Sequence, residues 1–187
     1  MKNNFQLKIM NQYWLDKSSS DYDLCSHGEI YLQVNDTIIT QSGEDEEWGV
    51  SESALALLRT LNKDYICNLN NLDNEEGLIF HGCGAILMMG CPISINWSVK
   101  HTNDQVLLSD FVKVTTTSSD EATHYPNLQI ELNKEYYKQQ ILQFALQAKQ
   151  LFETSPAKAF FDDYDKQMYI EFWEEYDQLL QKATLNK

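Results

Sequence analysis

The apolar pattern changes its period near residue 133, and this change constrains the fold more than any other feature. Before that point apolar and polar residues mostly alternate, as at Phe5, Leu7 and Ile9, which is typical of β-strands. After it, apolar residues recur at every third or fourth position, which is typical of amphipathic helices. Strands followed by helices predict an α+β fold, with helices packed on a mainly antiparallel sheet.

Two long helices are predicted in the helical segment 133–183. The first covers 134–153, with Asn133 as its N-cap, and Pro156 lies in the break that follows. The second runs from about residue 163 to 182. Its expected apolar face consists of Met168, Tyr169, Phe172, Trp173, Tyr176, Leu179 and Leu180.

One helix is predicted inside the strand-rich segment 1–132, over about 51–63. Ser51 is its expected N-cap, and the negative charge of Glu52 in the first turn interacts favourably with the helix dipole. The remaining strands are expected at 29–40 (with a hairpin turn at Asn35-Asp36), 78–80, 85–89, 93–99, 106–116 and 128–132. With no Gly/Ser-rich linker, the 187 residues are expected to form a single domain, 1–187.

The chain is strongly acidic, and this narrows the class of partner. It has 14 Lys+Arg against 28 Asp+Glu, a formal charge of −14. Such a surface repels nucleic acid and anionic lipid, because phosphate binding needs clustered Lys and Arg. It attracts a basic protein and speeds their encounter. The alternative is that the charge serves solubility alone. The oligomeric state stays open.

One segment is long enough to suggest a membrane span. Between Gly77 and Val99 there is no Asp, Glu, Lys or Arg. Three further glycines, Pro92 and two polar side chains make it a poor transmembrane helix, so buried strands are the better explanation. The first ten residues lack the apolar core of a signal peptide, and a cytoplasmic location is expected.

Two short motifs could bind a metal. Cys25 and His27 share one face of an extended chain, and so do His81 and Cys83. If the two edges met, two thiolates and two imidazoles would form a tetrahedral zinc set. The alternatives are ordinary buried or loop positions, or Cys83 as a nucleophile beside His81.

Acidic residues next to aromatic ones suggest a binding surface. Glu44, Asp45, Glu46 and Glu47 lead directly into Trp48, and Asp162 and Asp163 follow Phe160 and Phe161. Aromatic anchors surrounded by charge are typical of interface hot spots. The alternatives are a solvated loop and aromatic residues that belong to the core, with Trp48 packing at a helix entry.

Three stretches resemble an uncharacterised group of bacterial cytoplasmic proteins. They are the segments 48–61, 81–92 (His-Gly-Cys-Gly at its start) and 172–177 (Phe-Trp-Glu-Glu-Tyr-Asp). This resemblance implies no catalytic residue. In size, acidity and α+β order the chain is also similar to immunity proteins that neutralise bacterial toxins.

These observations favour a binding protein over an enzyme, because no familiar catalytic motif is present. The first hypothesis is an immunity-type inhibitor that occludes a basic site on a toxin such as a nuclease. Its expected contacts are residues 44–48, with Asp162 and Asp163 second. The alternatives are a metalloprotein or metal-dependent enzyme that uses the Cys/His set, and a scaffold that self-associates through 164–180.

Overall fold

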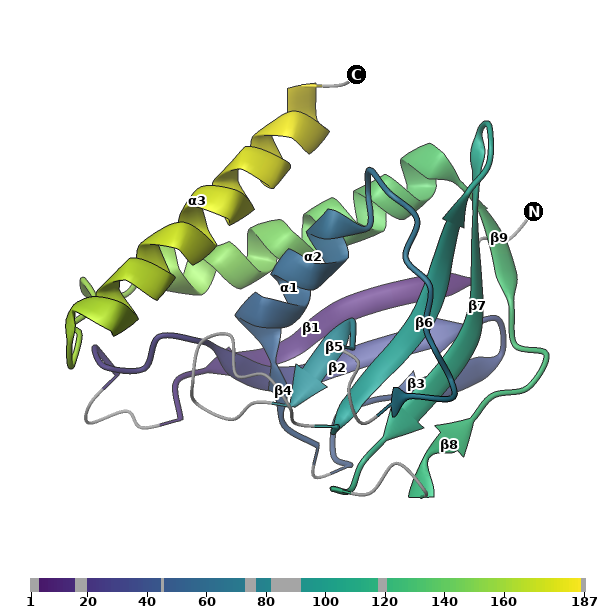
Figure 1. Cartoon of the computed structure of the whole chain (residues 1–187), viewed down its shortest axis with the longest axis horizontal. Helices are drawn as coiled ribbons and strands as arrows, with labels where there is room; N and C mark the ends of the chain where they lie inside the picture. The colour runs from purple at the N-terminus through teal and green to yellow at the C-terminus, as the bar shows by residue number, and fades with distance from the viewer. Residues whose placement is uncertain are drawn as a thin grey trace.

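The computed structural model of the protein describes residues 4–15, 20–44, 46–72, 77–81, 92–117 and 121–185. Within them the chain forms nine strands and three helices, and every strand pairing is antiparallel (Figure 1). The strands are β1 (Phe5–Tyr13), β2 (His27–Val34), β3 (Thr37–Thr40), β4 (Trp48–Gly49), β5 (Ile79–His81), β6 (Ser94–His101), β7 (Gln105–Val114), β8 (Thr123–His124) and β9 (Ile130–Asn133). The helices are α1 (Val50–Arg59), α2 (Lys134–Glu153) and α3 (Asp163–Leu185). The predicted α+β class is confirmed.

The first strands follow the alternation in the sequence. Phe5, Leu7 and Ile9 of β1 are buried, while the residues between them are more exposed. Strands β2 and β3 form the predicted hairpin, and Asn35 in its turn has a φ of 54°. Asn adopts this left-handed conformation more readily than most residues, which suits it to the turn.

The centre of the sheet is narrow. The strand order is β1-β2-β4-β5-β6-β7-β8, with β3 also beside β2 and β9 also beside β7. Strands β4 and β5 have two and three residues, so they join two larger parts of the sheet through short ladders. The strand expected at 85–89 lies outside the described residues.

The two C-terminal helices agree with the helical period. Helix α2 has the predicted bounds, and the Asn133 side chain accepts hydrogen bonds from the N–H groups of Glu135 and Tyr136. Helix α3 begins at the predicted residue and continues to Leu185. Phe172 and Tyr176, from the predicted apolar face, are buried against the rest of the protein.

Helix α1 differs from the prediction at both ends. It begins at Val50, and Gly49 rather than Ser51 is its N-cap. Ser51 lies inside the helix, where its Oγ accepts a hydrogen bond from the Ser26 N–H, 2.9 Å away. The Ser51 hydroxyl therefore binds the backbone at Ser26 and does not cap its own helix. The helix ends at Arg59, four residues before the predicted end.

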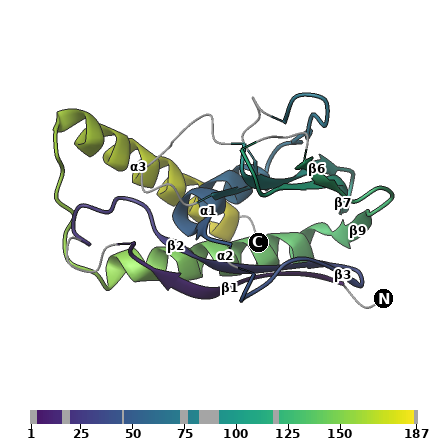
Figure 2. The ribbon, with the colours of Figure 1, turned by 90° about the horizontal axis from the view of Figure 1, so that it is seen from below.

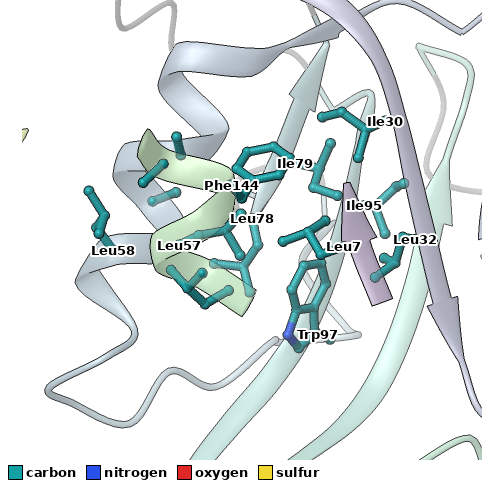
Figure 3. Packing of buried hydrophobic residues seen from close by; sticks show 14 of the residues in the cluster. Leu7, Ile30, Leu32, Leu57, Leu58, Leu78, Ile79, Ile95, Trp97 and Phe144 are labelled. Carbon is teal, nitrogen blue, oxygen red and sulfur yellow. The ribbon is translucent and has the colours of Figure 1, made fainter. Parts of the chain in front are cut away.

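Most of the strands and all three helices contribute to one main hydrophobic core. Figure 3 shows Leu7 next to Trp97, with Leu57 and Phe144 of the helices on one side of them and Leu32 on the other. In Figure 2, β1–β3 lie along one side and β6–β7 along the other, with α1 and α2 between them. Lys113 of β7 donates to the Ile39 carbonyl of β3 at 2.9 Å, so the sheet curls toward itself.

Helix α2 runs beside the outer edge of β1. The Tyr136 hydroxyl donates to the Phe5 carbonyl at 2.7 Å, and the Gln147 amide donates to the Ile9 carbonyl at 3.2 Å. In return, the Gln12 amide donates to the Ala148 carbonyl at 2.9 Å. Edge-strand groups that another strand could otherwise pair with are thus used within the chain.

The uncharged segment 77–99 is not helical where the structure describes it. Its described residues include β5 and most of β6, in which Ile95, Trp97 and Val99 belong to the core. Among the described helices, none combines the length and the apolar character needed to cross a membrane.

Candidate functional site

Asp23, Cys25 and His27 converge where a loop enters β2. The three residues alternate along the chain, with a bend at Cys25 just before β2 begins at His27. Cys25 Sγ lies 3.7 Å from His27 Nε2, and Asp23 Oδ1 lies 3.4 Å from the same nitrogen. One potential ligand atom from each residue lies within 4.8 Å of the other two. The Cys25 and His27 side chains are buried, at 0% exposure.

The geometry is not that of a nucleophile activated by a base. In such a relay one imidazole nitrogen faces the nucleophile and the other faces the carboxylate. Here the thiol and the carboxylate both face Nε2, and Nδ1 is buried without a hydrogen-bond partner among the described residues. The thiol, the carboxylate and the imidazole nitrogen instead point toward one another, as the ligand atoms of a single metal ion do.

Hydrogen bonds fix the carboxylate of Asp23. Its Oδ2 accepts from the Leu15 N–H at 2.9 Å, which leaves Oδ1 directed toward His27. Ser26, between Cys25 and His27, is held by two hydrogen bonds. Its N–H donates to Ser51 Oγ, and its own Oγ accepts from the Gln12 amide at 2.8 Å. Outer hydrogen bonds of this kind orient the residues that bind a metal.

A lysine lies near this cluster. Lys158 Nζ donates to the Ser20 carbonyl at 2.7 Å and sits 3.1 Å from the centroid of the Trp14 ring. Burial lowers the pKa of Lys158 to about 8, although the nearby carboxylates of Asp23 and Asp21 act in the opposite direction. The amine is therefore partly neutral at mildly alkaline pH, unlike an exposed lysine.

The structure does not bring His81, of the second predicted metal pair, to the first pair. His27 lies opposite Gly49 in β4, and Gly49 lies opposite Phe80 in β5, so His27 and Phe80 share a face. His81 follows Phe80 and points to the other face. With β4 between them, the backbones of β2 and β5 are about 10 Å apart. His81 is therefore not a co-ligand of His27, and Cys83 lies outside the described residues.

The predicted acidic loop is engaged within the chain. Lys113 Nζ lies 3.3 Å from Glu44 Oε2 and also forms an ion pair with Glu46. Glu47 accepts a hydrogen bond from the Tyr13 hydroxyl at 2.8 Å. Burial, with the neighbouring carboxylate of Glu47 second, raises the pKa of Tyr13 to about 12. Asp45 lies outside the described residues.

Trp48 is a core residue, and its expected role as a contact is corrected here. It is 1% exposed in β4, and its indole N–H donates to Thr40 Oγ1 at 3.2 Å. The residue sits where the chain enters α1, so the apolar side chain is needed for packing. The alternative stated from the sequence, a core tryptophan at a helix entry, describes its position.

The start of α3 has the opposite character. Phe161 and Tyr164 are 78% and 70% exposed, and Asp162 and Asp163 between them are exposed too. The ring of Phe161 stacks on Tyr22, with centroids 4.7 Å apart. We call Tyr22, Phe161 and Tyr164 with these two aspartates the aromatic corner. Its position is fixed by the Ala159 N–H, which donates to the Asp21 carbonyl at 2.8 Å.

Asp162 has a structural role as well. Its Oδ1 accepts a hydrogen bond from the Asp165 N–H at 2.8 Å, the contact of a helix N-cap. Asp163 is the first residue of α3, where a negative charge interacts favourably with the helix dipole. Sequence reasoning identified both aspartates but not Tyr22, because its partner Phe161 is distant in the chain.

The chain was compared with known proteins in three ways. No family model, no curated protein and no solved structure matched it.

Proposed function

We propose that the protein is an acidic binding protein that covers a basic surface of a partner protein, as an immunity-type inhibitor covers a toxin. The observation behind this proposal is the aromatic corner. Two aromatic side chains that are at least 70% exposed stand next to carboxylates, on a chain of charge −14. Aromatic side chains are enriched in protein–protein interfaces, and exposed apolar patches rimmed by polar residues mark such sites.

The mechanism is occlusion. The net charge attracts a basic surface and raises the encounter rate, and the rings of Phe161 and Tyr164 then bury apolar area against the partner. If the partner is a nuclease, the carboxylates of Asp162 and Asp163 would occupy positions that nucleic-acid phosphates otherwise take. We place the main contacts here rather than at Glu44, Glu46 and Glu47, because those three carboxylates already pair with side chains of the chain. Asp162 instead uses one oxygen for a backbone N-cap hydrogen bond.

The test is affinity capture from the native cell with quantitative mass spectrometry. The wild type should retain one basic protein in stoichiometric amount after a wash at moderate salt. The double variant Phe161→Ala/Tyr164→Ala should retain far less, with a dissociation constant raised roughly 30-fold or more, since hot-spot truncations cost about 2 kcal/mol or more. Both side chains are mostly exposed, so the fold should be unaffected.

A charge variant tests the steering step separately. Asp162→Asn/Asp163→Asn should slow association several-fold at low salt, while the amide oxygen introduced at position 162 can still accept the N-cap hydrogen bond. Asp36→Asn/Asp104→Asn is the matched control, because both aspartates are exposed in turns outside the aromatic corner. Equal capture by the wild type and by Phe161→Ala/Tyr164→Ala would refute the proposed surface. Absence of any basic partner would refute the proposed function.

A further inference from the structure

We propose that Asp23, Cys25 and His27 form a zinc-binding site, independent of the partner surface. The ligand atoms are Asp23 Oδ1, Cys25 Sγ and His27 Nε2. All three come from one segment of five residues, so the site needs no contact between distant parts of the chain. It differs from the set predicted from the sequence, because Asp23 takes part and His81 does not.

The two separations from His27 Nε2 are those expected of zinc co-ligands. Zinc lies about 2.3 Å from sulfur and about 2.1 Å from nitrogen or oxygen, so a tetrahedral shell puts S and N about 3.6 Å apart and N and O about 3.4 Å apart. The observed separations from Nε2 are 3.7 Å to Sγ and 3.4 Å to Oδ1. A hydrogen bond from a ring N–H to a carboxylate is normally about 2.7–2.9 Å long.

The charges and the donor types also favour zinc. A thiolate and a carboxylate together carry the two negative charges that neutralise a divalent cation, which is needed where Cys25 and His27 are fully buried. Sulfur and imidazole donors exclude calcium and magnesium, which take oxygen ligands. The three side chains leave one position of a tetrahedral shell for a further ligand.

The surroundings hold the ligands in place before a metal binds. Asp23 is oriented by the Leu15 N–H, and the residue between Cys25 and His27 is held by Ser51 and Gln12. Since His27 Nε2 is directed to the other two ligands, metal binding would leave the ring proton on Nδ1. A metal here would tie the loop before β2 to the sheet.

The test is titration of the metal-free full-length chain with Co²⁺, followed by displacement with Zn²⁺. We expect one equivalent of Co²⁺ to produce the charge-transfer absorption of a cobalt–thiolate bond, and Zn²⁺ to remove it. Cys25→Ser should abolish this absorption. Cys67→Ser is the matched control, because Cys67 is also a buried cysteine but lies outside the cluster, and it should keep the absorption.

A second readout does not depend on the colour. Excess Zn²⁺ should raise the melting temperature of the wild type and of Cys67→Ser, but not of Cys25→Ser. Asp23→Asn should bind Co²⁺ more weakly by at least the roughly 10–100-fold that loss of an outer hydrogen-bond partner costs, since an amide oxygen lacks the carboxylate charge. No absorption with the wild type would overturn the proposal. The proposal would also be overturned if Cys83→Ser lost the absorption while Cys25→Ser retained it, because the thiolate ligand would then be Cys83.

Discussion

Two fully buried tryptophans differ in how their indole nitrogens are satisfied. Trp48 donates its N–H to Thr40, whereas the Trp97 nitrogen has no hydrogen-bond partner among the described residues. An unmade buried hydrogen bond costs free energy, and replacing its donor with an apolar group of similar shape recovers part of that cost. Both Trp97→Phe and Trp48→Phe should lower the free energy of unfolding. We expect the loss for Trp97→Phe to be smaller than that for Trp48→Phe by about 1–2 kcal/mol.

Urea denaturation of both variants and the wild type measures the difference. The comparison is matched, because each substitution removes the same atoms from a side chain that is at most 1% exposed. An equal or larger cost for Trp97→Phe would show that its nitrogen has a partner in solution.

At the residue scale, the sequence indicated part of each proposed site. The alternation of Cys25 and His27 indicated a shared face, and one further step of two residues along the same segment reaches Asp23. Phe161 was named for its acidic neighbours, but its stacking on Tyr22 depends on tertiary contacts. A buried Trp48 was one of two alternatives from the sequence, and its pairing in β4 between β2 and β5 decides between them.

Among the strands, β7 is tied to β3 and to the 41–47 loop by one side chain. Lys113 is 9% exposed, donates to the Ile39 carbonyl and pairs with Glu44 and Glu46. We expect Lys113→Met to lower the free energy of unfolding by about 2–3 kcal/mol, because it leaves the carboxylate of Glu46 without its cation in a largely buried position.

A double-mutant cycle, followed by thermal and urea denaturation, checks this. Lys113→Met/Glu46→Gln should recover about 1 kcal/mol relative to Lys113→Met alone, because the stranded charge is removed. Lys113→Arg, which keeps the charge, should cost less than Lys113→Met. If the double variant were no more stable than Lys113→Met, the pair would not be coupled.

At the element scale, prediction succeeded where a period lasted for many residues. Helix α2 has both predicted ends, since 20 residues of amphipathic pattern and the Asn133 cap agree. Helix α1 was shifted because Ser51, a good N-cap by type, satisfies Ser26 instead. Strand β4 was missed because two residues cannot display a period; only its neighbours β2 and β5 define it.

The net charge of −14 affects the stability of the whole molecule. Repulsion between like charges favours the expanded chain, and salt screens it over about 10 Å at 0.1 M. We therefore expect the urea midpoint to rise as NaCl increases from about 0.02 to about 0.3 M.

The Asp36→Asn/Asp104→Asn variant is the control, because it carries two fewer negative charges and should depend less on salt. The measurement is urea denaturation of both proteins at each salt concentration. A midpoint that falls with salt would contradict the expectation, since screening would then weaken ion pairs such as Arg59–Glu175 more than it relieves repulsion.

The position of α2 against β1 has a consequence during synthesis. The ribosome makes β1 before the other strands, whereas Tyr136 and Gln147, which occupy its carbonyls, are added more than a hundred residues later. For that interval the nascent chain displays an open nine-residue β-edge that a second chain could join. Premature termination before residue 134 would make this exposure permanent. Truncated products should therefore accumulate as aggregates, because they lack the helix α2 that covers the edge of β1.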